Sequence, residues 1–212
     1  MTGYLRKNAA LIIIVGFSIV LGSVYAAEAA SKQIPLSGTS WSVSGESSLN
    51  YKYTYDKKLH SKTIVDNESG TMTFAAGGAF SGDVFTGTWT QKGNNYTLSV
   101  EPSTIITFIE NLVSAKGITG TATIKSIKIG GTVSSTKTSE KITLTAQVTG
   151  TVAVTYPVVL TASFTESFIL SGTPATVPSP AIAGEEDSLQ GLSGPFGEML
   201  DDIVEAVTNE DQ

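Results

Sequence analysis

The stretch KITLTAQVTGTVAV, residues 141–154, decides the fold class of this chain because its side chains alternate between apolar and polar. One face carries Ile142, Leu144, Ala146 and Val148, and the other carries Thr143, Thr145, Gln147 and Thr149. A period of two residues with one apolar face is typical of a β-strand whose sheet covers a core on one side. Threonine suits the outer face because it is β-branched and polar.

Similar runs fill most of residues 36–172, separated by glycine and asparagine turns. LNYKYTY (49–55) alternates, and GTMTF, GAFSGDVF, GTWTQ and NYTLSV within residues 70–100 predict a meander of short strands. We expect a turn at Gly93-Asn94-Asn95 and a tight hairpin at Gly130-Gly131. In LTASFTESFIL (160–170) the pattern slips between Phe164 and Phe168, which indicates a β-bulge.

Two segments follow the helical period instead. PSTIITFIENLVSAKG, residues 102–117, places apolar residues on one helix face, with proline at its start and glycine at its end. These residues are Ile105, Phe108, Ile109, Leu112 and Val113. A second stripe near the C-terminus comprises Phe196, Met199, Leu200, Ile203, Val204 and Val207. An isolated helix of this length is marginal in water, so we expect it to dock on its own barrel or on a protein partner.

Together these patterns predict an all-β fold: an antiparallel up-and-down β-barrel with one inserted amphipathic helix and a C-terminal helix. A β-sandwich is the alternative. The barrel is favoured because closing the sheet removes exposed strand edges.

Several motifs resemble those of bacterial lipocalin-like barrels of the calycin type. GTSWSV (38–43) lies near the first expected strand, and GTMTF, GGAFSG and GTWTQKGNNYTL follow within residues 70–98. In that family a G-x-W motif closes the barrel base; here two residues separate Gly38 from Trp41, and Gly87-Thr88-Trp89 lies further along the chain. The resemblance covers about residues 36–100 and implies a barrel that holds a small hydrophobic ligand.

The first 29 residues have the pattern of a secretory signal peptide: Arg6 and Lys7, an apolar run over residues 9–21, and small residues around Ala26 and Ala29. An uncleaved membrane anchor is the alternative. We therefore expect an exported protein, periplasmic or secreted, with no stable membrane span after cleavage. The further division is a barrel domain (30–173), a Pro-rich linker (174–192) and an acidic amphipathic helical tail (193–212).

Charge argues against nucleic acid as a partner. Without residues 1–29 the chain keeps 11 lysines, no arginine and 18 acids, for a net charge of about −7. Nine of those acids lie in residues 185–212, where there is no base. The absence of cysteine excludes disulfides and thiolate metal sites.

The residues usual in catalysis are scarce. His60 is the single histidine, and no G-x-S-x-G elbow, phosphate-binding glycine loop or EF-hand spacing is present. We predict a non-enzymatic protein with no catalytic residues, no metal and no cofactor.

Seven aromatic residues could line an apolar pocket or form plain core: Trp41, Tyr51, Tyr53, Phe80, Phe85, Trp89 and Phe164. The leading hypothesis is an exported β-barrel that binds a small hydrophobic ligand with these residues. The alternative is a structural or protein-interaction module that acts through the apolar stripe of its acidic C-terminal helix.

Overall fold

The computed structural model describes residues 33–82, 86–157, 159–175 and 190–208. Residues 34–212 form one compact unit, which contains every described helix and strand. The predicted signal peptide, Phe85 and most of the predicted linker lie outside the described residues.

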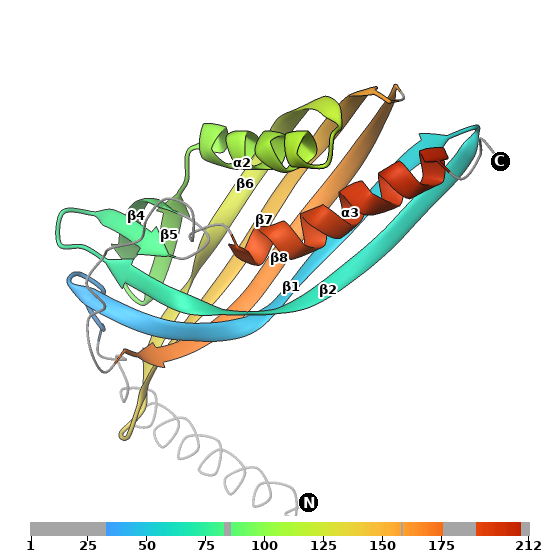
Figure 1. Cartoon of the computed structure of the whole chain (residues 1–212). Coiled ribbons are helices and arrows are strands. Elements are labelled where there is room, and N and C mark those ends of the chain that lie inside the picture. Colours follow the sequence, from blue (N-terminus) through green and yellow to red (C-terminus); the bar gives the residue numbers. More distant parts are fainter. Residues whose placement is uncertain (1–32, 83–85, 158, 176–189, 209–212) are drawn as a thin grey trace, which may run out of the picture. The chain divides into compact units, whose positions relative to one another are not determined.

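Eight strands close into a ring in which each strand is antiparallel to the next and β8 pairs back with β1 (Figure 1). The strands are β1 (Thr39–Tyr55), β2 (Lys58–Phe74), β3 (Ala79–Gly82), β4 (Thr86–Lys92), β5 (Asn95–Ser99), β6 (Thr119–Ser135), β7 (Glu140–Tyr156) and β8 (Leu160–Pro174). Helix α2 (Pro102–Ala115) is inserted between β5 and β6, and helix α3 (Gln190–Thr208) follows β8. The predicted all-β up-and-down barrel with two helices is confirmed, and the sandwich alternative is wrong.

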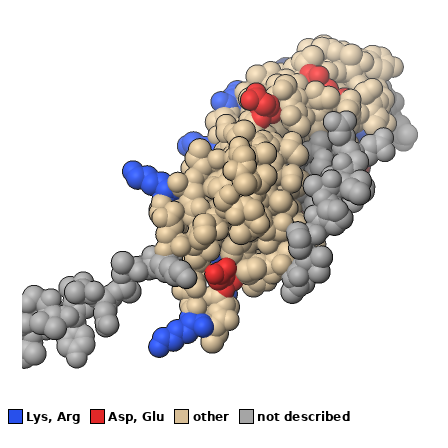
Figure 2. Space-filling model, turned by 90° about the vertical axis from the view of Figure 1, so that its left-hand side faces the viewer, with Lys and Arg blue, Asp and Glu red and all other residues tan. Residues whose placement is uncertain are grey.

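The expected alternation is present in β7, whose apolar side chains face the core while its threonines face outward. The same alternation continues along β8 and β1, so one inner apolar face runs across three adjacent strands. On the face of the molecule drawn in Figure 2, charged side chains are few and widely separated. Threonine-rich outer faces therefore keep this surface polar with little charge.

The ring is closed in two different ways because its strands differ greatly in length. Strand β2 has 17 residues but pairs with β3 only through Met72–Phe74. Strand β6 also has 17 residues and pairs with β5 only between positions 129 and 132. Along the rest of these two edges, within the described part of the chain, the neighbours are helices and not strands. We call the part around β3–β5 the strand-closed half and the part beside α2 and α3 the helix-closed half.

Helix α2 covers the free edge of β6, and α3 packs against α2, β1 and β2 (Figure 1). Glu110 on α2 accepts a hydrogen bond from the backbone N–H of Ala122 at 3.1 Å, which satisfies one donor at the β6 edge. Side chains of α2 thus cover the edge of β6 where β5 no longer pairs with it. Among the described helices, none is long and apolar enough to span a bilayer.

Two local predictions were wrong. Strand β6 runs straight through Gly130-Gly131, and the hairpin lies at residues 136–139, where the Thr136 N–H donates to the Ser139 carbonyl at 2.8 Å. A Cβ on Gly131 would lie 1.8 Å from the Thr143 carbonyl oxygen and 2.8 Å from the Tyr96 hydroxyl. This glycine is needed for close strand approach and not for a turn.

The bulge expected in β8 is also absent, since β8 pairs with β1 and β7 without a register shift across residues 164–168. The apparent slip arises because a glutamate, Glu166, occupies the inward position between Phe164 and Phe168.

Candidate functional site

The most distinctive site is the interior of the helix-closed half, where α3 lies against the inner face of the sheet. Four apolar side chains of α3 are at most 1% exposed: Phe196, Met199, Leu200 and Ile203. Phe196 packs edge-on against Phe164 of β8, with ring centroids 5.0 Å apart. The helix therefore fills the space that a ligand would occupy in an open barrel.

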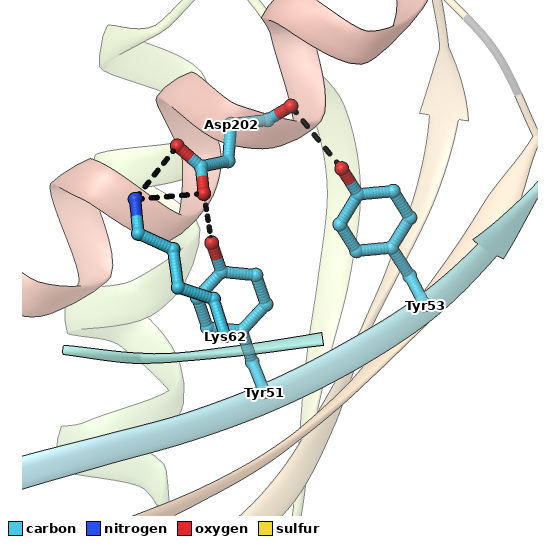
Figure 3. A network of polar contacts seen from close by, with 4 residues as sticks. All are labelled: Tyr51, Tyr53, Lys62 and Asp202. Carbon is cyan, nitrogen blue, oxygen red and sulfur yellow. Dashed lines mark hydrogen bonds and ion pairs between the residues drawn. The ribbon is translucent and has the colours of Figure 1, made fainter. Parts of the chain in front are cut away.

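A polar network fixes α3 to the β1–β2 hairpin (Figure 3). The Asp202 carboxylate accepts hydrogen bonds from the Tyr51 hydroxyl and from Lys62 Nζ, the latter at 3.0 and 3.2 Å. The Tyr53 hydroxyl donates to the Asp202 main-chain oxygen at 3.2 Å. Three side chains from the sheet thus converge on one turn of α3.

The network also changes the acid–base properties of the two tyrosines. Burial raises the pKa of Tyr51, and its hydrogen bond to Asp202 raises that pKa further. Burial and then the charge of Asp202 raise the pKa of Tyr53. Both hydroxyls therefore stay protonated and act as donors to α3. On the other side, Lys116 at the end of α2 pairs with Asp201 at 2.6 Å.

A second polar group lies deeper, on the inner face of β1, β2 and β8. We call it the polar layer; it consists of Ser47, Glu68 and Glu166. Ser47 and Glu166 are fully buried, and Ser47 Oγ donates to Glu68 Oε1 at 3.0 Å. Neither carboxylate oxygen of Glu166 has a hydrogen-bond partner among the described residues. Burial raises the pKa of Glu166 to about 8, and the nearby charge of Glu68 acts in the same direction.

Glu68 also has a raised pKa, chiefly because of its burial. The Ser47 hydrogen bond opposes this shift, and the charge of Asp66 adds to it. A fully buried acid and a partly buried acid, both with raised pKa, thus lie near each other in the barrel wall.

A cavity of about 30 Å³ lies beside the polar layer, where β2 leaves β3. Its lining is mainly apolar and includes Met72, Phe80, Phe168 and Leu170, together with Glu68. A space of this size holds about two or three water molecules at most, because one water needs about 10–15 Å³. Buried side chains of α3 belong to the same core cluster as the inward side chains of the strands.

The predicted ligand-binding residues separate into two groups. Trp41, Phe80 and Trp89 lie in the strand-closed half, near an aromatic cluster in which Phe74 contacts Phe80, Trp89 and Tyr96 at centroid distances of 5.4–5.5 Å. The second group, Tyr51, Tyr53 and Phe164, lies in the helix-closed half against α3. Phe85 is outside the described residues.

The predicted partner-binding stripe lies on α3, and its own barrel covers it. Four of its members form part of the core described above, and Val204 is partly buried against that core. The Val207 side chain is outside what the structure describes. Of the two arrangements expected for this helix, the structure contains the one docked on its own barrel.

Sequence reasoning missed the polar layer and the residues that bind Asp202. Glu166 had a usable signal, since it shares the parity of Phe164 and Phe168 in an otherwise apolar inward row. The pairing of Asp202 with Tyr51 had no such signal, because the two residues are 151 positions apart.

Other candidate sites are weaker. The part of the chain that the structure describes has no group of three or more histidine and acidic residues able to hold a metal ion. His60 stacks on Tyr53 at a centroid distance of 4.8 Å, and its Nε2 is buried without a hydrogen-bond partner there.

The chain matches no protein-family model and no curated protein. The fold and the site define its class: an all-β, up-and-down barrel-like protein whose side wall is completed by two helices. Its function must be argued from that geometry.

Proposed function

We propose that this protein is an exported, non-enzymatic β-barrel that binds a small, elongated apolar molecule in the space now filled by α3. Helix α3 acts as the closing element of that space. The observation that carries the proposal is the mode of closure. Because α3 contacts the barrel through side chains, it can undock without breaking the backbone hydrogen bonds of the sheet.

The lining of this space supports an apolar ligand. The floor under α3 includes the buried Phe164, and Tyr51 and Tyr53 also contact the helix. Once α3 leaves, these residues form an elongated apolar surface with polar groups at a few points. Such a composition is typical of small-molecule sites.

The small size of the cavity beside the polar layer supports α3 as the closing element that must move for a ligand to bind. The cavity beside the polar layer, at about 30 Å³, is too small for an organic ligand, so a ligand that takes up the space under α3 requires α3 to move outward. The ligand would then replace the apolar contacts that α3 makes, which offsets the cost of releasing the helix.

The test uses a disulfide that locks α3 in place. An ideal Cβ on Gly194 would lie 3.3 Å from Asp66 Oδ2, so the two side chains are neighbours, and loss of free thiol on oxidation checks that the pair has formed a disulfide. The chain has no other cysteine to interfere. The double variant Asp66→Cys/Gly194→Cys is titrated with the neutral apolar dye Nile red, with and without reductant. Dye fluorescence reports binding.

We expect the reduced form to bind the dye and the oxidised form to bind it at least about ten-fold more weakly. The single variant Gly194→Cys serves as the control and should bind equally under both conditions. Equal binding by the locked and unlocked forms, or no binding by either, would contradict the proposal.

A further inference from the structure

Glu166 is the feature that neither packing nor hydrogen bonding explains. It is fully buried, it lies on the inner face of β8 between two phenylalanines, and both carboxylate oxygens lack a partner in the described structure. A buried polar group without a hydrogen bond is costly, and a leucine at this position would avoid that cost. The Glu166 carboxyl can therefore accept a hydrogen bond from a group that is not among the described residues.

The residues near Glu166 favour a positively charged group as its hydrogen-bond donor. Glu68 lies close enough for its charge to act on Glu166, and its hydrogen bond from Ser47 orients it inside the barrel. Lys62 and Lys116 form ion pairs with Asp202 and Asp201 on α3, not with these two acids. Two carboxyl groups with no compensating base favour a positively charged group between them.

Glu166 lies between the part of β8 that contacts α3 and the part that lines the 30 Å³ cavity. Its neighbour Phe164 packs against Phe196 of α3, and its other neighbour Phe168 lines the cavity. A molecule that replaces the apolar face of α3 would therefore pass Glu166 before its end reached the cavity. The cavity provides room for a small head group and a water molecule.

We propose that the ligand of this barrel is an amphiphilic amine whose ammonium group pairs with Glu166 and Glu68 while its apolar chain takes the place of α3. This inference rests on the proposed function. An ammonium group supplies up to three hydrogen-bond donors and one positive charge. A fatty acid would add a third acid to the polar layer, and an alcohol would offer one donor and no charge.

The experiment compares three probes of equal chain length: decylamine, decanol and decanoic acid. Each displaces Nile red from the purified protein at pH 7, which measures its relative affinity. We expect the amine to bind at least about ten-fold more tightly than the alcohol, and the acid to bind most weakly. This comparison uses the wild-type protein and does not depend on the folding of a variant.

Two variants then assign the preference to a residue. Glu166→Gln keeps the shape of the side chain but cannot give up a proton to become the anionic partner of an ammonium group, so the amine should lose most of its advantage while the alcohol binds as before. Glu46→Gln is the matched control, because Glu46 lies on the outer, exposed face of neighbouring β1. It should leave the preference unchanged.

Each possible result decides the question. Equal affinity of amine and alcohol for the wild type, or a preference that survives Glu166→Gln, would overturn the amine proposal while the apolar site stands. That outcome would mean that Glu166 binds only an internal water molecule. If none of the three probes displaces the dye, both this inference and the proposed function fail.

Discussion

The two halves of the barrel are closed by different kinds of interaction. In the strand-closed half, β3, β4 and β5 continue the backbone hydrogen-bond ladder, and Phe74 anchors an aromatic cluster inside it. In the helix-closed half, α3 is attached by buried side chains and by the Asp202 network, with no backbone hydrogen bond to the sheet among those described. We therefore expect the first closure to break only when the whole fold unfolds and the second to open separately.

The sharpest test of this difference compares two buried phenylalanines. Phe74→Ala, in the strand-closed half, should lower the free energy of unfolding by about 3–5 kcal/mol, because the ring is fully buried among three other aromatic rings. Phe196→Ala, on α3, should lower it by only about 1–2 kcal/mol, since α3 can undock and so limit the loss. Denaturant unfolding measures both values.

Hydrogen exchange shows whether the loss of stability in Phe196→Ala is confined to α3. In Phe196→Ala the amides of α3 should exchange faster while those of β7 and β8 keep their protection. If protection falls equally in α3 and in the strands, α3 is part of the same cooperative unit as the barrel. The distinction between the two closures would then not hold.

The polar layer, between the two halves, should make stability depend on pH. The pKa of Glu166 is raised to about 8 in the folded protein, so the folded state holds its proton more tightly than the unfolded chain does. Stability from this group is therefore greatest at acid pH and falls as pH rises from about 4.5 to about 8, by at most about 1.4 kcal/mol per pH unit. Glu68 contributes in the same direction.

Glu166→Leu should remove most of this dependence. We expect the variant to be more stable than the wild type by about 1–3 kcal/mol at pH 8, because it no longer buries an unpartnered carboxyl, and to gain less at pH 5. Thermal unfolding between pH 5 and pH 8 provides the measurement. A gain that is the same at both pH values would show that the raised pKa of Glu166 does not control stability.

The smallest expected effect concerns the polar attachment of α3. Asp202→Ala removes the acceptor of Tyr51 and Lys62 and should weaken the docking of α3 by about 1–2 kcal/mol, measured by hydrogen exchange of the helix. Asp201→Ala is the control: it breaks a more exposed pair with Lys116 and should cost less than about 0.5 kcal/mol. Equal losses in the two variants would mean that the buried tyrosine contacts contribute nothing.

Much of the fold could be predicted because its signals are local. The period of two in residues 141–154 identifies β7, and the apolar spacing of residues 105–113 identifies α2 within one or two residues of its ends. The apolar stripe after residue 195 likewise identifies α3 as a helix. Each of these patterns depends only on which residues share a face of one element.

The two wrong local predictions share one cause. Gly130-Gly131 has the composition of a turn, but its role is set by Tyr96 and Thr143, which approach from other strands. Glu166 breaks an apolar row in sequence, yet its backbone continues as a regular strand. In both cases the deciding contacts come from distant residues, which a single sequence does not reveal.

The candidate site was predictable only as a set of apolar side chains. Phe164 and Tyr51 could be assigned to an inner face by their parity, and the stripe on α3 by its helical spacing. That these two surfaces meet, with Asp202 between Tyr51 and Lys62, follows from contacts between residues 140 or more positions apart.

By itself, the sequence determined the secondary structure, the all-β class and the inward faces, because hydrophobic periodicity acts over a few residues. Only the tertiary structure decided that short strands would close one half of the ring and helices the other. It alone also placed the buried Glu166 near Glu68, with no hydrogen-bond partner for Glu166 in the described part of the chain. The physical reason is that strand length, register and the desolvation of a buried charge depend on partners that the chain brings together only when it folds.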